Sequence, residues 1–352
     1  MSRHNRNGTI RRHLLATVGV MLAIVAVAAA QAQATTAVRL KWSGPIALHG
    51  LHGQRISALA CPSSSQCTVV DQNHQVTFNP STGAESAPVK LFPARSEASI
   101  SGVACPALTR CTAVRWGQEV AFDPRSTAVM KPATVDRDAD ENFGGVACPS
   151  TTLCVGGDGG GSEVAFDPAT GRLVRPAASV ADIPLDATAC PTLDRCTSID
   201  SGADIVTFDP RSGRALSESE VDPAMESHSE EEGSDSSPAA LACPSADLCV
   251  TVDPLGNAVS FNPLSRGAGT VVSIDRGHWL TSVACPSTTE CVAVDSRGRA
   301  FRGDPANGKW LPETVPGAKT LIAVACATSR ECVAIDPASG SWHRRYGVFG
   351  RL

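Results

Sequence analysis

Fourteen cysteines are the residues of this 352-residue sequence whose spacing most clearly indicates chemistry. Five residues separate the members of each pair, enough for a tight hairpin that sets the two cysteines opposite each other on neighbouring strands, within disulfide range. Metal ligation is the alternative, but zinc sites generally bring closer cysteine pairs and further ligands together, and no histidine recurs with the pairs. The spacing therefore predicts seven disulfides: Cys61 with Cys67, Cys105 with Cys111, Cys148 with Cys154, Cys190 with Cys196, Cys243 with Cys249, Cys285 with Cys291, and Cys326 with Cys332.

A series of aspartates follows the cysteine pairs. Each could begin a tight turn by accepting hydrogen bonds from backbone N–H groups two or more residues further on. Together they could instead form a partial ring of carboxylates that holds a cation or a basic ligand. Both interpretations stay open on the sequence, in which the second copy has Arg115 and the other six have Asp71, Asp158, Asp200, Asp253, Asp295 and Asp336.

Calcium is the one cofactor that the sequence suggests. Asp136, Asp138 and Asp140 alternate as at the start of a calcium-binding loop. However, Glu141 stands where such loops have glycine, and Ala147 stands where they have glutamate. A solvated acidic loop is therefore the alternative, and no metal site is assigned.

These residues recur because the chain repeats one unit seven times. Successive first cysteines are 44, 43, 42, 53, 42 and 41 residues apart, a period typical of propellers and solenoids. In the sixth copy, four short apolar segments alternate with turn residues: Leu280–Cys285, Val292–Val294, a segment around Phe301, and Lys309–Leu311. The pattern predicts an all-β fold, a seven-bladed β-propeller of four-stranded antiparallel blades.

Turn residues also recur between the third and fourth expected strands, where the Asx side chain can hold the turn. They are Asn79-Pro80, Asp123-Pro124, Asp167-Pro168, Asp209-Pro210, Asn262-Pro263 and Asp304-Pro305. In the third copy, the glycine-rich stretch 156–161 is expected to be a flexible turn.

The two ends of the chain are expected to complete one blade together. The last copy contains two strands and a third expected over Ser341–Val348, but no fourth. The segment Leu40–His49 resembles the fourth strand of the sixth copy, Gly308–Val315. We therefore expect the N-terminal segment to supply the outer strand of the seventh blade and so close the ring.

Residues 1–34 are expected to be a signal peptide. A basic start precedes an apolar run over 14–30, and Ala32-Gln-Ala34 fits a cleavage site; an uncleaved anchor is the alternative. Residues 35–352 then form a single propeller domain with no further membrane span, interrupted by an acidic insertion at about 217–237 that is expected to be disordered. Without the four arginines of 1–34, the 30 basic residues fall to 26 against 35 acidic ones, which gives −9 and does not favour nucleic acid binding.

The repeat Ser-Val-x-Cys-Pro-x4-Cys-Val-Ala-Val-Asp resembles that of secreted bacterial propeller-type repeat proteins, common in actinobacteria and mostly of unassigned function, over about residues 40–350. The resemblance implies that the turns after second strands and the segments between blades share the binding face. No histidine lies in a metal-protease spacing or beside a Gly-x-Ser-x-Gly turn, so no catalytic residue is assigned. We expect a secreted, monomeric, non-catalytic binding or scaffold protein whose partner is an extracellular protein or glycan. A propeller-fold hydrolase or lyase acting on extracellular glycans is the alternative.

Overall fold

The computed structural model describes residues 41–50, 56–93, 99–137, 143–222, 240–337 and 346–351, and for the last of these ranges the backbone alone. The expected signal peptide, Asp138, Asp140 and most of the acidic insertion lie outside these residues. Residues 40–352 form one compact unit.

Seven sheets, all of antiparallel strands, are built from the described residues. The first sheet contains β2 (Ala58–Ser63), β3 (Gln66–Val70), β4 (His74–Phe78) and β5 (Val89–Lys90). The second contains β6 (Gly102–Ala107), β7 (Arg110–Arg115), β8 (Gln118–Phe122) and β9 (Ala133–Thr134). The third contains β10 (Phe143–Ser150), β11 (Leu153–Asp158), β12 (Ser162–Asp167) and the two short strands β13 (Arg172–Leu173) and β14 (Ala178–Ser179), which both pair with β12.

The remaining four sheets repeat this order. The fourth contains β15 (Leu185–Thr192), β16 (Arg195–Asp200), β17 (Asp204–Phe208) and β18 (Ala215–Glu220). The fifth contains β19 (Ala240–Ser245), β20 (Leu248–Val252), β21 (Asn257–Phe261) and β22 (Thr270–Ser273). The sixth contains β23 (Leu280–Ser287), β24 (Glu290–Asp295), β25 (Arg299–Asp304) and β26 (Lys309–Thr314), and the seventh contains β27 (Ala323–Thr328), β28 (Glu331–Pro337), β29 (Tyr346–Arg351) and β1 (Trp42–Leu48).

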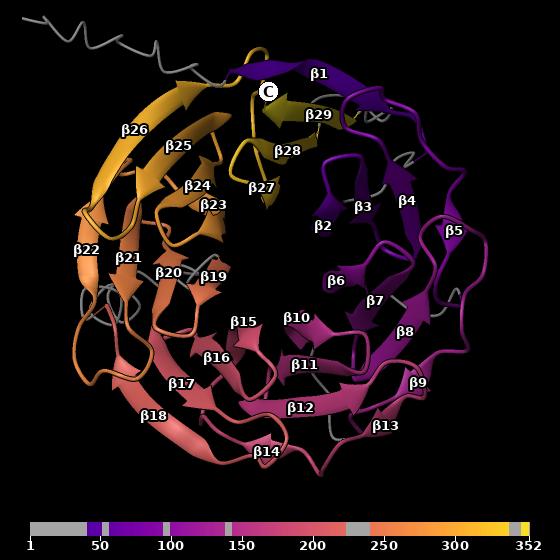
Figure 1. Ribbon diagram of the computed structural model, residues 1–352, viewed down its shortest axis with the longest axis vertical. Helices are drawn as coiled ribbons and strands as arrows, with labels where there is room; N and C mark the ends of the chain where they lie inside the picture. The colour runs from indigo at the N-terminus through magenta and orange to yellow at the C-terminus, as the bar shows by residue number, and fades with distance from the viewer. Residues whose placement is uncertain are drawn as a thin grey trace, which may run out of the picture. The chain divides into compact units, whose positions relative to one another are not determined.

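The sheets follow one another in chain order around a common centre, with the first strand of each repeat innermost (Figure 1). Innermost strands of successive sheets contact each other, and β2 of the first sheet also contacts β27 of the seventh. This arrangement of meandering four-stranded sheets is a β-propeller, so the predicted fold is confirmed at that level.

The second strand of each sheet carries the core. β3 and β11 are buried along their whole length, because neighbouring sheets cover both of their faces. Seven apolar clusters fill the spaces between sheets, and each combines residues of two neighbours; one, for example, joins Val155 of β11 to Cys196 of β16 and Phe208 of β17. The cluster between the seventh and first sheets includes Val333 and Cys67.

The cysteine hairpins form as the spacing predicts. All seven disulfides join the two cysteines of one repeat, and no cysteine is free. Their Cα atoms lie 3.9–4.1 Å apart, closer than the spacing of regular opposite pairs. The ladder between the first two strands is irregular beside each bridge, as between Ala60 and Ser63.

The N-terminal strand pairs with the C-terminal strand. β1 lies antiparallel to β29, with Ile46 opposite Val348, and the two strands lie side by side in Figure 1. β1 is the outer strand of the seventh sheet, as predicted; the stretch Ser341–Arg345 lies outside the described residues.

Two local expectations from the sequence are wrong in part. Ser217–Glu220, the start of the expected acidic insertion, belongs to β18, which pairs with β17, and the following Val221 is buried. Of the glycine-rich stretch 156–161, Gly159 and Gly160 form the expected turn, but Gly156 and Gly157 belong to β11. They are glycines because a Cβ there would lie 2.8 Å from the ring of Phe143 and 2.6 Å from Leu185, respectively.

Candidate functional site

The turns of the sheets divide between two faces. Because the strands alternate in direction, the turns after the first and third strands lie at one end of each sheet, and the turn after the second strand lies at the other end with the segments that join sheets. We call these the hairpin face and the connector face. The disulfides and the Asx-Pro turns lie on the hairpin face, and the predicted aspartate series lies on the connector face.

On the hairpin face, each Asx-Pro turn is held by its own side chain, as predicted. Asn79 Oδ1 accepts from the backbone N–H of Ser81, and Asp167 Oδ1 accepts from that of Ala169, both at 2.9 Å. The same bond occurs in the turns of Asp123, Asp209, Asn262 and Asp304. These side chains are committed to the backbone, which makes this series structural.

On the connector face, the aspartates also hold turns. In five sheets the Oδ1 atom accepts hydrogen bonds of 2.6–3.0 Å from backbone N–H groups two to four residues further on; these residues are Asp71, Asp158, Asp200, Asp253 and Asp295. Asp336 instead accepts from the N–H of Lys319, in the segment before its sheet. All six are buried. Five of them hold turns, as the first interpretation predicted. Their carboxylates are spread around the face, one per sheet.

A second set of buried acidic residues lies beside the aspartate series at junctions between sheets. The sequence patterns above did not predict them. Asp222, after β18, interacts with Asp253 of the neighbouring sheet. Asp275, after β22, meets Asp295 through Arg299, whose guanidinium donates to Asp275 Oδ2 and to Asp295 Oδ2, both at 2.6 Å. Burial raises the pKa of Asp253, and burial and Asp295 raise that of Asp275, against Arg299 and His278. The signal was a repeated Val/Ile-Asp pair after the fourth strand: Val135-Asp136, Val221-Asp222 and Ile274-Asp275.

Of the three alternating aspartates of the predicted calcium loop, Asp136 alone lies among the described residues, where it is buried. No group of three or more His, Cys, Asp or Glu side chains in the described ranges is arranged to hold a metal ion. The calcium prediction stays a prediction.

Arg115 occupies, in the second sheet, the position that is aspartate in the other six sheets, and it lies at the junction between the first two sheets. Its guanidinium donates to Asn73 Oδ1 at 2.8 Å and to the carbonyl of Pro93 at 3.3 Å, and it lies 4.3 Å from the ring centroid of Phe92. The side chain is buried. Arg115 is therefore a packing residue of this junction.

Large apolar side chains are exposed on the connector face. Trp116, in the turn of the second sheet, is 45% exposed; Trp279, before β23, is 56% exposed; and Ile183, before β15, is 40% exposed. Trp116 also has a φ of 37°, which is unfavourable for an aromatic residue. Backbone outliers of this kind cluster at binding and catalytic sites.

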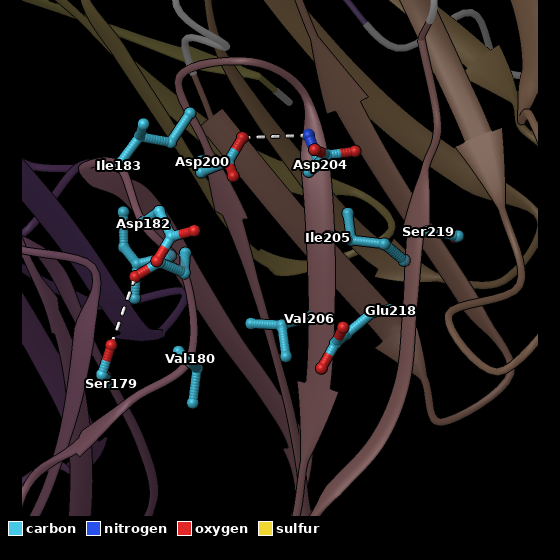
Figure 2. A pocket seen from close by; sticks show the side chains of 12 residues that line it. Ser179, Val180, Asp182, Ile183, Asp200, Asp204, Ile205, Val206, Glu218 and Ser219 are labelled. Atoms are coloured by element: carbon cyan, nitrogen blue, oxygen red, sulfur yellow. Dashed lines mark hydrogen bonds between the residues drawn. The ribbon is translucent and has the colours of Figure 1, made fainter.

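A groove of about 640 Å³ lies between the third and fourth sheets (Figure 2). Its walls come from the segment after β14, from the end of β16 and the start of β17, and from β18. Among the described residues that line it, four are acidic and none is basic; the acids are Asp182, Asp200, Asp204 and Glu218. Burial raises the pKa of Asp200 to about 6, Asp204 adds to the rise, and the N–H groups of Asp204 and Gly202 oppose it.

Among the described residues, no helix has the length and apolar character to cross a membrane. Seven disulfides indicate an oxidising, extracytoplasmic environment.

The fold resembles solved WD40 propellers. One is described as the crystal structure of RRP9 WD40 repeats, with a TM-score of 0.71 and 12% sequence identity over 88% of this chain and 99% of the other. A second is the structure of U3-55K, with a TM-score of 0.70 and 12% identity over 88% of this chain and 98% of the other. No family model and no curated protein matches the sequence. At this identity the likeness establishes the fold alone.

Proposed function

We propose that this protein is a secreted, non-catalytic binding propeller that recognises an extracellular or cell-surface partner through its connector face. The two exposed indoles of Trp116 and Trp279 carry the proposal. Tryptophan is enriched among the residues that dominate binding energy at interfaces. The disulfides support the extracellular setting, and the WD40-like fold is compatible with a scaffold.

We further propose that the seven sheets are seven blades of one closed ring. The pairing of β1 with β29 supports closure, and so do the contact between β2 and β27 and the apolar cluster between the seventh and first sheets. A closed ring holds the connector turns in fixed positions, which a binding face requires.

A cosedimentation experiment tests the binding function. Unreduced, purified protein is incubated with intact cells of the species that carries the gene, and the bound fraction is measured after pelleting. We expect Trp116→Asn together with Trp279→Ser to weaken binding at least tenfold; asparagine suits the positive φ of position 116. The control changes exposed apolar residues of the hairpin face, Leu108→Ser with Leu193→Ser, which we expect to leave binding unchanged. Binding that is absent, or equally weakened by both pairs, would overturn the proposal.

A glycan hydrolase or lyase is the second candidate, and one observation favours it. Asp200, with a pKa of about 6, lies in an open groove with further carboxylates, and glycoside hydrolysis uses a protonated and an ionised carboxyl group. Turnover of any member of a polysaccharide panel, abolished by Asp200→Asn, would establish this activity. A panel without turnover would leave the binding function.

A further inference from the structure

In the groove between the third and fourth sheets, one buried carboxylate has only one of its two oxygen atoms hydrogen-bonded to described residues. Asp200 is only 5% exposed. Its Oδ1 atom accepts from the N–H groups of Gly202 and Asp204, at 2.9 and 3.0 Å. Within the described residues, its Oδ2 atom accepts no hydrogen bond. Figure 2 shows this second oxygen turned toward the space between Asp182 and Ile205.

The rest of the groove suits an amphipathic cation. Val180, Ile183 and Val206 provide the apolar part of the lining, and Asp182 and Asp204 are exposed. Glu218 lies on the far wall and also borders a smaller hollow that contains Arg266. In the part of the chain that the structure describes, no lysine, arginine or histidine lines the groove itself. An acid at the base of apolar walls matches a side chain with an aliphatic stem and a charged end.

We propose that this acidic groove binds a lysine or arginine side chain presented by a partner protein, with the cationic end on Asp200 Oδ2. The proposal rests on the proposed binding function and names the chemistry of one contact. The stem packs on Ile183 and Val206, and the ammonium or guanidinium forms a charge-assisted hydrogen bond with the buried carboxylate. The volume of about 640 Å³ accommodates such a side chain with room for neighbouring residues.

The titration of Asp200 gives the contact a pH dependence. In the unoccupied groove, burial raises the pKa of Asp200 to about 6, and the groups facing it are the acids Asp182, Asp204 and Glu218. Below that pH the carboxyl is neutral and does not attract a cation. Binding is therefore strong at pH 7.5 and falls as the pH drops below 6.

The test uses the full exported chain, isotopically labelled, and small probes of known chemistry. Nα-acetyl-lysine methylamide, the arginine analogue and the neutral citrulline analogue are titrated separately, and the amide resonances of Gly202 and Asp204 are followed by NMR. We expect the lysine and arginine probes to shift both amides saturably at pH 7.5, at least tenfold less at pH 5, and the citrulline probe to shift neither.

The variant Asp200→Asn separates the contact from the turn. Asparagine keeps Oδ1 for the two backbone N–H groups but removes the charge, so we expect a folded protein with at least tenfold weaker probe binding. Asp158→Asn is the matched control, because Asp158 holds the equivalent turn of the third sheet and does not line the groove. Should Asp200→Asn not fold, Asp182→Asn with Asp204→Asn removes two exposed charges, and we expect weaker binding again.

Several results would overturn the proposal. One is the absence of any amide shift at 50 mM probe, and another is equal binding of the lysine and citrulline probes. A third is binding of the lysine probe by the Asp200→Asn variant that equals binding by wild type. The fourth is displacement of the probe by millimolar Ca²⁺ with amide shifts larger than those of the probe, which would indicate a metal-cation site. Each of these is compatible with cell binding that depends on Trp116 and Trp279, so failure of this inference is distinguishable from failure of the proposed function.

Discussion

A glycine position in the connector turns shows how single residues are selected. The residue before the third strand is left-handed in five sheets: Gly117, Gly161, Gly256 and Gly298 have φ values of 64°, 79°, 88° and 79°, and Ala203 has 68°. At Gly256 a Cβ would lie 2.0 Å from the carbonyl oxygen of Asp275. Glycine is thus required there by contact as well as by conformation. Of these five sheets, the fourth alone places alanine at this position, beside the acidic groove, so the turn of Asp200 stores backbone strain at the proposed binding site.

Glu119 is a second residue whose position in the fold lowers stability, in this case in a pH-dependent way. It is 2% exposed in β8, and burial raises its pKa to about 8, with Asp167 adding to the rise and Arg110 opposing it. The folded-state pKa lies above the unfolded value of 4.5. Below pH 4.5 the Glu119 carboxyl is protonated in both the folded and the unfolded states, so its ionisation does not lower the free energy of unfolding there. The free energy of unfolding falls as the pH rises from there through 8, by at most about 1.4 kcal/mol for each pH increment of one.

We expect Glu119→Gln to stabilise the protein at alkaline pH. The first sheet places Gln75 at the equivalent position, so the amide fits the repeat and does not ionise. Urea unfolding is measured for wild type and variant at pH 5, 7 and 8.5. The two proteins should have similar stability at pH 5, and the variant should be more stable than wild type by about 2–4 kcal/mol at pH 8.5. Glu331→Gln, at an exposed site, is the control. A difference between Glu119→Gln and wild type that does not change with pH would contradict the prediction.

At the scale of elements, the cysteine hairpin is the unit that repeats. Each disulfide closes a loop of about seven residues between the first two strands, and chain entropy assigns it about 2.4 kcal/mol. The second cysteine of each pair also packs in a junction between sheets, as Cys291 does with Val250 and Phe301. The bridge therefore joins a hairpin to the core.

We expect Cys285→Ala with Cys291→Ala to lower the free energy of unfolding by about 2–4 kcal/mol, from lost loop closure and lost packing. Denaturant unfolding under non-reducing conditions measures the change. Thr288→Ala, an exposed change in the same hairpin, should cost less than about 0.5 kcal/mol. Equal stability of the double cysteine variant and wild type would show that the bridge is redundant in the folded ring.

The elements are also where the sequence is most informative. Hairpins, Asx turns and the outer strand β1 follow from residues a few positions apart or from the repeat itself, and these predictions agree with the structure. The groove and the carboxyl pairs depend on residues from two sheets, such as Asp222 and Asp253. Their meeting is set by packing between repeats, which no local pattern encodes. Gly156 was assigned to a turn for a different reason: its strand position depends on Phe143, on the paired strand of the same sheet, which occupies the space of a side chain there.

At the scale of the whole molecule, one tryptophan links the two ends of the sequence. Trp42 of β1 is 5% exposed and packs in the cluster between the sixth and seventh sheets, with Val292 and Ala334. Its Nε1 donates to Glu313 Oε2 of β26 at 2.9 Å. The N-terminal strand therefore holds two sheets, not only the one in which it pairs.

We expect Trp42→Ala to lower stability by about 3–5 kcal/mol, as for other buried large-to-small changes, and to speed amide exchange in β29 and β28. Trp279→Ala, on an exposed indole, is the control and should change stability by less than about 0.5 kcal/mol. A loss below about 1 kcal/mol at Trp42, or unchanged exchange in β29, would contradict the proposed closure by the N-terminal strand.

The disulfides of this molecule also bear on the order of events during its synthesis. Fourteen cysteines can pair in about 135,000 ways, yet every native partner lies six residues away. In an oxidising environment each pair can form its bridge before the next pair is available, so the native pairing depends on sequence proximity rather than on the completed fold. Correct oxidation can thus precede assembly, and a chain interrupted between repeats would already carry the right bridges in every repeat that it has.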